Sequence, residues 1–258
     1  MKIFLTSSTD FYYKDENGIR ISQKFSNING IYDNLKKYIK KFDNFLFVAS
    51  SEDNIVTDNY ANLTFDSFNL TMPFKNYKVL DNRNISDAEI LVKNADLIYL
   101  CGGHVPTQHK LFEKLNLKEL LKTSNAVILG QSAGSMNMSN VVYAQPELDG
   151  EYVNKNYIKY FNGLDLVQFN IIPHYENLLD VTVDGVSNKQ ICIMDSFLRP
   201  FIAYSDGAYV FQNDDKIFMC GKAYAFRKGK KKLISNENCV TDITNFINKL
   251  YKGYNDSL

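Results

Sequence analysis

The first half of the sequence alternates between short apolar runs and longer segments with helical periodicity, and this alternation restricts the fold more than any other feature. Apolar strands separated by helices of ten or more residues are typical of a parallel sheet covered on both faces. The apolar runs occupy residues 2–8, 44–51, 78–81, 96–103 and 126–130. We therefore predict an α/β fold with a mostly parallel sheet and helices on both faces.

Helical patterns fill the intervals between these runs. Residues 29–42 place apolar side chains at helical spacing and lysines on the opposite face. The segment 86–95 begins with Ser86 and has Glu89 three residues later, which is the pattern of a capping box. Residues 106–122 predict one amphipathic helix with Pro106 near its first turn. We expect a further, partly irregular helix after residue 51.

The second half has a different character, because turns rich in Gly, Asn and Asp separate many of its apolar runs. Such spacing is typical of antiparallel strands. The predicted strands are 141–145, 165–174, 200–205, 208–213, 216–221 and 223–234, with a basic hairpin turn at 227–232 and helices at 186–198 and 239–252. We predict that antiparallel strands extend the sheet and that residues 1–258 form a single α/β domain.

The composition argues against several classes of partner. Lys+Arg and Asp+Glu both number 29, so the formal net charge is zero and no overall positive field attracts nucleic acid. The N-terminal stretch MKIFLTSSTD has too short an apolar core for a signal peptide, and no run reaches the length of a membrane span. We expect a cytoplasmic monomer or homodimer without nucleic-acid or membrane partners.

Four cysteines are present, and none forms a C-x-x-C pair: Cys101, Cys192, Cys220 and Cys239. The chain therefore lacks the usual sequence pattern of a zinc or redox site. We expect reduced, mostly buried thiols, no metal and no organic cofactor.

Residues 130–135 read GQSAGS and follow the apolar run AVIL. The pattern G-x-S-x-G is typical of a nucleophile elbow, a turn from strand to helix that holds the serine backbone at positive φ. Gly130 and Gly134 would provide the space that this turn needs. We therefore predict that Ser132 is a nucleophile at the amino end of a helix, where the Ala133 N–H can stabilise an oxyanion.

A serine hydroxyl needs a base at neutral pH, and the sequence has three histidines. His174 ends the apolar run FNIIPH, so we expect it to emerge at a strand end and to act as the base. His109 falls in a predicted helix and is interpreted as a surface residue. The glycines at 102–103 follow another apolar run and offer a second oxyanion donor. We expect Gly102, His104 and Gln131 to line the substrate site.

These motifs occur in the order and spacing of the S51 serine peptidases, a family that includes the aspartyl dipeptidase peptidase E and cyanophycinase. The matching stretches, within residues 96–210, are CGGHVPTQ (101–108), GQSAGSMNM (130–138), IIPHY (171–175) and AYSDGAYV (203–210). The resemblance implies a fold similar to the class I glutamine amidotransferases, with a serine nucleophile in place of cysteine.

The resemblance also implies roles for individual residues. Ser132 matches the nucleophile, His174 the general base, and Gly103 and Ala133 the oxyanion positions. No metal or organic cofactor takes part in the implied reaction.

Three carboxylates are candidates for the acid that orients His174. Asp206 is preferred, because its YSDG turn resembles the turn in which peptidase E has a glutamate. Glu147 lies where the family has another acidic residue, and Glu176 forms a His-x-Glu pattern similar to that of the amidotransferases.

One departure concerns specificity. Peptidase E has an arginine-rich helix after its histidine, and an arginine there recognises the N-terminal aspartate of the substrate. The corresponding stretch, residues 186–197, has Lys189 as its only cation. Because lysine lacks the two-pronged geometry that suits a carboxylate, the sequence does not support aspartyl specificity.

We therefore predict a serine hydrolase that cleaves small peptides, in the manner of a dipeptidase, through an acyl-enzyme. A cyanophycinase-like, isopeptide or amide hydrolase is the alternative within the class. A catalytically silent binding protein of the same fold is the alternative outside it. Glutamine amidotransfer is disfavoured, because the residue at the elbow is Ser132 rather than cysteine.

Overall fold

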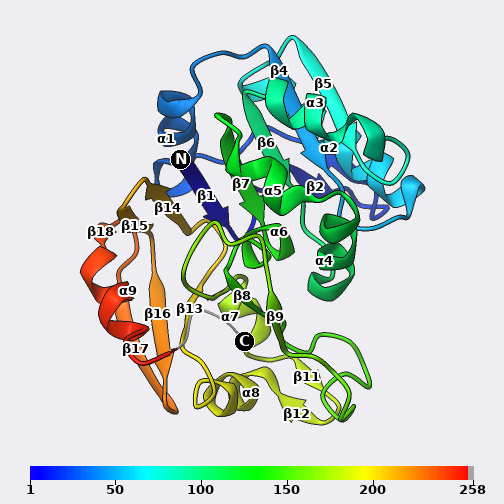
Figure 1. Cartoon of the computed structure of the whole chain (residues 1–258). Coiled ribbons are helices and arrows are strands. Elements are labelled where there is room, and N and C mark those ends of the chain that lie inside the picture. Colours follow the sequence, from blue (N-terminus) through cyan, green and yellow to red (C-terminus); the bar gives the residue numbers. More distant parts are fainter. Residues whose placement is uncertain (255–258) are drawn as a thin grey trace.

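A computed structural model describes residues 1–254 and shows an eight-stranded sheet at the centre of the chain (Figure 1). Its order is β18-β15-β14-β1-β7-β6-β4-β5. The strands are β1 (Lys2–Thr6), β4 (Asn44–Val48), β5 (Asn76–Leu80), β6 (Leu97–Leu100), β7 (Val127–Gln131), β14 (Tyr209–Asn213), β15 (Lys216–Cys220) and β18 (Val240–Asp242). Strands β1, β7, β6, β4 and β5 pair in parallel, and β14, β15 and β18 extend them antiparallel. The predicted fold class is confirmed.

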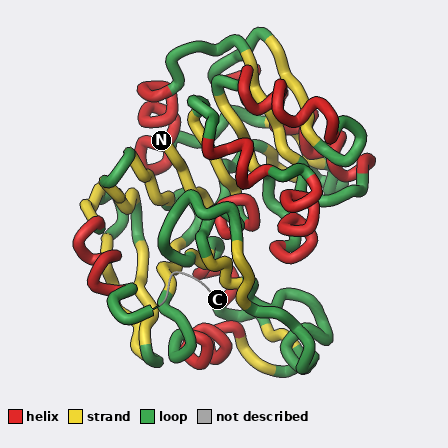
Figure 2. The backbone as a smooth tube through the Cα atoms, viewed as in Figure 1, coloured by secondary structure: helices red, strands yellow, loops and turns green. Residues whose placement is uncertain are grey.

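Both faces of this sheet carry buried apolar side chains that pack against helices. Figure 2 shows helices on both sides of the strands. In β4, Phe45 and Phe47 join the core on one face, while Leu46 and Val48 join the core on the other. The helices α1 (Ile31–Tyr38) and α2 (Asn54–Thr71) cover the phenylalanine face. The opposite face is covered by α3 (Ala88–Asn94), α4 (Val105–Lys114), α5 (Leu117–Lys122) and α9 (Thr244–Leu250).

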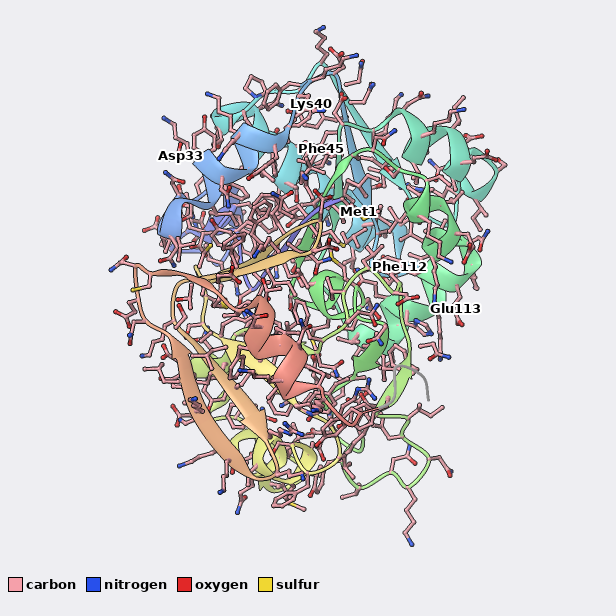
Figure 3. All side chains as sticks on the ribbon, turned by 60° about the vertical axis from the view of Figure 1, so that its left-hand side comes forward. Met1, Asp33, Lys40, Phe45, Phe112 and Glu113 are labelled. Atoms are coloured by element: carbon pink, nitrogen blue, oxygen red, sulfur yellow. The ribbon has the colours of Figure 1, made fainter. Side chains whose placement is uncertain are left out.

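Burial of these side chains stabilises the sheet. Phe45 is fully buried among aromatic neighbours, whereas Glu113 lies at the periphery of the molecule (Figure 3). Each fully buried phenylalanine contributes roughly 1.5–3 kcal/mol relative to an exposed one. The strand ends that carry the candidate site are therefore held by a well-packed core.

A second sheet lies in the C-terminal half and was not predicted (Figure 1). Its order is β10-β13-β16-β17, formed by β10 (Ile171–Ile172), β13 (Phe201–Tyr204), β16 (Ala223–Arg227) and β17 (Lys230–Ser235). β10 and β13 pair in parallel, and the other pairs are antiparallel. The helices α7 (Tyr175–Leu178) and α8 (Asn188–Asp195) contribute side chains to the core beside this sheet.

Smaller elements complete the described chain. They are the hairpin β2 (Tyr12–Lys14) and β3 (Arg20–Ser22), the pairs β8 (Val141–Tyr143) with β9 (Tyr160–Asn162) and β11 (Thr182–Val183) with β12 (Val186–Ser187), the short helix α6 (Ala133–Met136), and the 3-10 turns Ile28–Gly30 and Ile85–Asp87. Within residues 1–254, no helix has both the length and the apolar character needed to cross a membrane.

Two helix predictions in the first half were wrong in detail. The single helix expected over 106–122 is divided, because Asn116 adopts a left-handed conformation with φ 50° between α4 and α5. The capping box expected at Ser86 does not form. A 3-10 turn precedes α3, and the Ser86 hydroxyl donates to the Asp87 side chain at 3.3 Å instead.

Three expectations in the second half also need correction. Only residues 171–172 of the strand predicted over 165–174 are in a sheet, because Asp165 has φ 61° and Val167 makes an isolated bridge to Ser139. The predicted helix over 239–252 begins with strand β18, and α9 starts only at Thr244. The hairpin turn predicted at 227–232 is confirmed, but it is confined to residues 228–229, and the rest of the basic segment belongs to strands β16 and β17.

Candidate active site

Ser132 follows β7 directly and has the strained backbone expected of an elbow. Its φ and ψ are 50° and −117°, and its amide donates to the Thr6 carbonyl at 2.9 Å. The chain then enters α6, so Ser132 lies at the carboxyl edge of the parallel sheet and at the start of a helix. Ligand sites of open α/β sheets lie at this edge.

The glycines on either side of the elbow are required by contacts with the backbone. A Cβ at Gly134 would lie 2.1 Å from the Leu100 carbonyl oxygen, and one at Gly130 would lie 2.8 Å from the Cα of Ser135. The Ser135 hydroxyl receives the Thr6 amide at 2.9 Å and donates to the Thr6 carbonyl at 3.0 Å. Strand β1 therefore holds the elbow from one side, while β6 packs against it from the other.

His174 lies two residues after β10 and is the N-cap residue of α7, with a left-handed backbone at φ 56°. Its Nδ1 lies 2.6 Å from Oδ1 of Asp206, and its backbone amide donates to the Ser7 hydroxyl at 3.2 Å. With Nδ1 protonated and donating to the carboxylate, Nε2 is the free basic nitrogen. The imidazole is therefore oriented through its side chain and its backbone.

Asp206 lies in the loop that joins β13 to β14 and binds two partners at once. Its Oδ2 accepts the Asn177 side-chain amide at 2.8 Å, while Oδ1 faces His174. The side chains of His174 and Asp206 are 30% and 35% exposed, so the pair is open to a substrate or a water molecule. The geometry matches a base and the acid that orients it.

The two alternative acids have other surroundings. Glu176 pairs with Lys222 at 2.9 Å, and Lys222 lowers the pKa of this carboxyl. Part of the Glu147 side chain is exposed to solvent, but the side chain lines a cavity and has protein on most sides. Burial, followed by the negative charge of Glu151, raises the pKa of Glu147 to about 7. Neither carboxylate binds His174 among residues 1–254, whereas Asp206 does.

The two predicted oxyanion donors have free backbone amides. Within residues 1–254, neither the Gly103 amide nor the Ala133 amide donates to another residue. A Cβ at Gly103 would lie 2.6 Å from that of Ser50, and one at Gly102 would lie 3.3 Å from that of Ser132. Gly102 thus lets the backbone pass close to Ser132, and Gly103 lets it pass close to Ser50, as an oxyanion site built from backbone amides would require.

The other predicted substrate-binding side chains differ in their placement. Gln131 lines the same cavity as Ser132, and its Oε1 accepts the hydroxyls of Tyr99 and Thr9. His104 is directed elsewhere, because its Nε2 binds Glu151 and its Nδ1 binds Thr107, both at 2.8 Å. It lines neither of the two cavities that contain Ser132, so its placement does not match the expected role.

Two cavities meet at Ser132 and His174. The larger has a volume of about 550 Å³ and includes Gly102, Gly103 and Gln131. The smaller has a volume of about 260 Å³ and contains the polar side chains Gln145, Glu147 and Asn188. Ser132 and His174 therefore line both cavities.

The thiol of Cys101 also lines the larger cavity but does not compete with the serine. Burial raises its pKa to about 12, so the thiol is protonated at neutral pH. Cys101, Cys192 and Cys220 are buried free thiols, and Cys239 is an exposed one.

Sequence analysis missed several residues that position the site. Ser7 bridges the His174 amide and the Ser205 carbonyl, and Asn177 binds the carboxylate of Asp206. Ser7 follows a predicted strand, so its place at the carboxyl edge was the available signal. No local sequence pattern pointed to Asn177 or Glu151, because their hydrogen-bond partners are distant in the sequence. His109 is half-buried against Phe161 rather than freely exposed.

Comparisons with known proteins identify a family and a fold. A sequence profile of peptidase family S51 matches residues 22–220. A peptidase from an acI-B1 Actinobacterium has a similar structure, with a TM-score of 0.62 and 14% identity over 93% of this chain and 96% of its own. A protein described as a peptidase E from Listeria monocytogenes EGD-e has a TM-score of 0.57 and 15% identity over 91% and 98%. A search of curated proteins finds no match.

Proposed function

The chain belongs to peptidase family S51, and from this premise we propose that it is a serine-type peptidase that cleaves small peptides through an acyl-enzyme. The observation that supports this most strongly is the shared site of Ser132 and His174, with Asp206 2.6 Å from the imidazole. The strained backbone of Ser132 supports the same assignment, since strain of this kind gathers at functional sites.

The proposed reaction starts with proton transfer from the Ser132 hydroxyl to Nε2 of His174, while the serine oxygen attacks the scissile carbonyl carbon. The carbonyl oxygen gains negative charge and binds the Gly103 and Ala133 amides, whose N–H groups are free to receive it. The imidazolium then protonates the leaving amine as the carbon–nitrogen bond breaks. A water molecule, deprotonated by His174, releases the acyl group and restores the serine.

Asp206 stabilises the imidazolium that forms in both halves of this cycle. Its carboxylate also fixes the tautomer that leaves Nε2 free. The Asn177 amide holds the second carboxylate oxygen, so Asp206 cannot easily rotate away from the ring. We therefore assign the orienting role to Asp206 rather than to Glu147 or Glu176.

The dimensions of the site support a short substrate. The cavities of about 550 and 260 Å³ lie on either side of Ser132, and each suits a ligand fragment rather than a long chain. Glu147, in the smaller one, is a suitable partner for the free ammonium group of a dipeptide. This assignment places the N-terminal residue of the substrate in the smaller cavity.

Nothing in the smaller cavity favours an N-terminal aspartate. Besides Ser132 and His174, its polar side chains are Gln145, Glu147 and Asn188, and Glu147 would repel a second carboxylate. Lys189 is exposed and does not line this cavity. The same Glu147 favours one alternative, in which the enzyme hydrolyses an isopeptide or amide bond, as a cyanophycinase-like enzyme does, next to a cationic side chain.

Labelling with a fluorophosphonate tests the proposal directly. We expect the wild-type protein to be labelled at Ser132 and to hydrolyse members of a dipeptide library, while Ser132→Ala is neither labelled nor active. Thermal unfolding of both proteins controls for folding. Hydrolysis that persists in purified Ser132→Ala would reject the mechanism. A folded wild-type protein that neither reacts nor cleaves would favour a silent binding protein.

A further inference from the structure

The larger cavity beside Ser132 has an aromatic wall that the proposed chemistry does not use. The hairpin β2–β3 and helix α2 lie over the ends of β4 and β6, and the four elements bring their rings to one space. The rings are those of Phe11, Tyr12, Tyr13, Phe47, Tyr60 and Tyr99. Phe47 and Tyr99 are buried and stacked at 5.7 Å, whereas Tyr12 and Tyr60 keep part of their surface exposed.

Arg20 fixes the hairpin over this space. Its guanidinium lies 5.4 Å from the Tyr12 ring and 5.1 Å from the Tyr60 ring, and the two rings meet edge to face at 6.4 Å. Such cation–π contacts are attractive and also orient the rings. The wall formed by Tyr12 and Tyr60 is therefore held in place before any ligand enters.

The cavity offers little that would pair with a charged side chain. Besides His174, the described residues that line it include one acidic side chain, Asp10, and one basic side chain, Lys14. The Asp10 carboxylate already accepts the Ser8 hydroxyl at 3.1 Å, and Lys14 is exposed to solvent. The Tyr99 hydroxyl is bound to Gln131, so this ring presents a satisfied polar group. An apolar or aromatic side chain fits these surroundings better than an ionic one.

The position of Glu147 decides which half of the substrate enters this cavity. If the free ammonium group binds Glu147 in the smaller cavity, the residue that follows the scissile bond extends to the other side of Ser132. We propose that the larger cavity is the subsite for this second residue and selects a large apolar, preferably aromatic, side chain. The inference rests on the proposed function, which supplies the scissile bond between the two cavities.

The test separates binding from turnover by measuring the dissociation constants of free L-phenylalanine and glycine for Ser132→Ala by ligand-observed NMR. These amino acids are the products that the subsite would release. We expect L-phenylalanine to bind at least about tenfold more tightly than glycine, as burial of an aromatic side chain predicts. With active enzyme, kcat/KM for dipeptides that share a first residue should favour Phe over Gly in second position by a similar factor.

Variants of Tyr60 test whether the aromatic wall is the surface that binds L-phenylalanine. Tyr60→Ala should lose most of the preference for L-phenylalanine, while Tyr60→Phe keeps the ring and should retain it. The matched control is Tyr254→Ala, because Tyr254 also packs with an arginine, Arg227 at 5.5 Å, and does not line this cavity. Should Tyr60→Ala fail to fold, Val56→Trp provides a second test, since Val56 is 42% exposed and lines the cavity. The added indole should fill the space and exclude L-phenylalanine.

Equal affinities for the two amino acids, or an L-phenylalanine affinity that Tyr60→Ala and Val56→Trp leave unchanged, would overturn the inference. These readings do not depend on catalysis. If Ser132 in the wild-type protein resists the fluorophosphonate, the proposed function fails, while the binding measurements still decide whether the cavity takes an aromatic side chain.

Discussion

A single methyl group added to the nucleophile elbow tests the geometry on which the site depends. The change is Gly134→Ala in α6, two residues after Ser132. The new Cβ would lie 2.1 Å from the Leu100 carbonyl oxygen and 2.7 Å from its carbon. Because both atoms belong to the backbone of a central strand, no side-chain rotation can relieve the contact.

The required displacement follows from these distances. A Cβ rarely approaches an oxygen more closely than about 3.0 Å, so α6 would have to move by about 0.9 Å from its 2.1 Å contact. This movement carries the Ala133 amide and pulls on Ser132. A misplacement of about 1 Å in a catalytic group costs on the order of a hundredfold in rate. Overpacking of this kind also destabilises the fold by roughly 1–3 kcal/mol.

The assay combines kcat/KM on the best dipeptide with thermal unfolding of the same preparation. We expect Gly134→Ala to remain folded at 25 °C, with Tm lowered by a few degrees, about 2–4 °C per kcal/mol for a chain of this size. Its kcat/KM should fall on the order of a hundredfold. Gly185→Ala is the control, because Gly185 has φ 79° and open space around its Cβ position. That variant should lose about 1 kcal/mol to backbone strain and keep its activity.

The reasoning would be refuted by a Gly134→Ala protein with unchanged Tm and unchanged kcat/KM. A loss of activity equal to that of Gly185→Ala would also count against it, because the effect would then not depend on the contact with Leu100. If Gly134→Ala unfolds altogether, the result agrees with the close packing of Gly134 against Leu100. Fluorophosphonate labelling at low temperature would then show whether Ser132 remains reactive.

The remaining predictions concern the base, its support and a titrating carboxylate. Asp206→Asn should lower kcat by about a thousandfold, while Glu176→Gln stays within about threefold of the wild type; the reverse order would reject Asp206 as the orienting acid. Ser7→Ala removes the acceptor of the His174 amide and should cost about 1 kcal/mol in unfolding experiments and about tenfold in kcat, with KM unchanged; a change in KM alone would contradict a positioning role. Between the ordinary Glu value of 4.5 and the raised pKa of about 7, the folded protein binds more protons at Glu147 than the unfolded chain does, so this group makes stability fall as pH rises. Glu147→Gln should therefore match the wild type near pH 4 and exceed its stability at pH 8, by no more than about 1 kcal/mol given the exposure of the side chain; a constant difference across denaturation curves from pH 4 to 8 would exclude this titration.

The central sheet could be predicted because burial on both faces leaves a strong signal. Strands such as β4 and β6 are apolar at every position or nearly so, since alternate side chains enter opposite cores. The carboxyl ends of parallel strands meet at one edge, which is why Ser7 and Ser132 could be expected near each other from local patterns alone.

The strands of the second sheet fall within those predicted over 165–174, 200–205 and 223–234, but no signal indicated that they form a separate sheet, and the hairpin β2–β3 had no signal at all. Strand β10 contributes only two residues, and β2 and β3 contribute three each, with mostly exposed or half-exposed side chains. Asn116 divides a continuous amphipathic pattern by adopting a left-handed backbone, a choice that the apolar spacing of 106–122 does not reveal. These elements depend on contacts between distant segments.

Within the candidate site, local pattern indicated the elbow and the strand-end histidine, but the orienting acid required tertiary structure. Glu147, Glu176 and Asp206 are all carboxylates at suggestive positions, and only the fold brings Asp206 to 2.6 Å from His174. Glu176 is two residues from the histidine yet pairs with Lys222. Proximity along the chain is therefore a poor guide to the partner of an imidazole.

The elbow belongs to the eight-stranded sheet, whereas His174 and Asp206 follow β10 and β13 of the four-stranded sheet. The proposed chemistry thus draws on two sheets, one that carries the Ser132 hydroxyl and one that carries the paired side chains of His174 and Asp206. The two sheets meet at the site, because the Ser7 hydroxyl after β1 accepts the His174 amide and Asp206 lies in the loop that leads from β13 into β14. A shift of one sheet relative to the other would therefore change the distance between the Ser132 hydroxyl and the His174 imidazole.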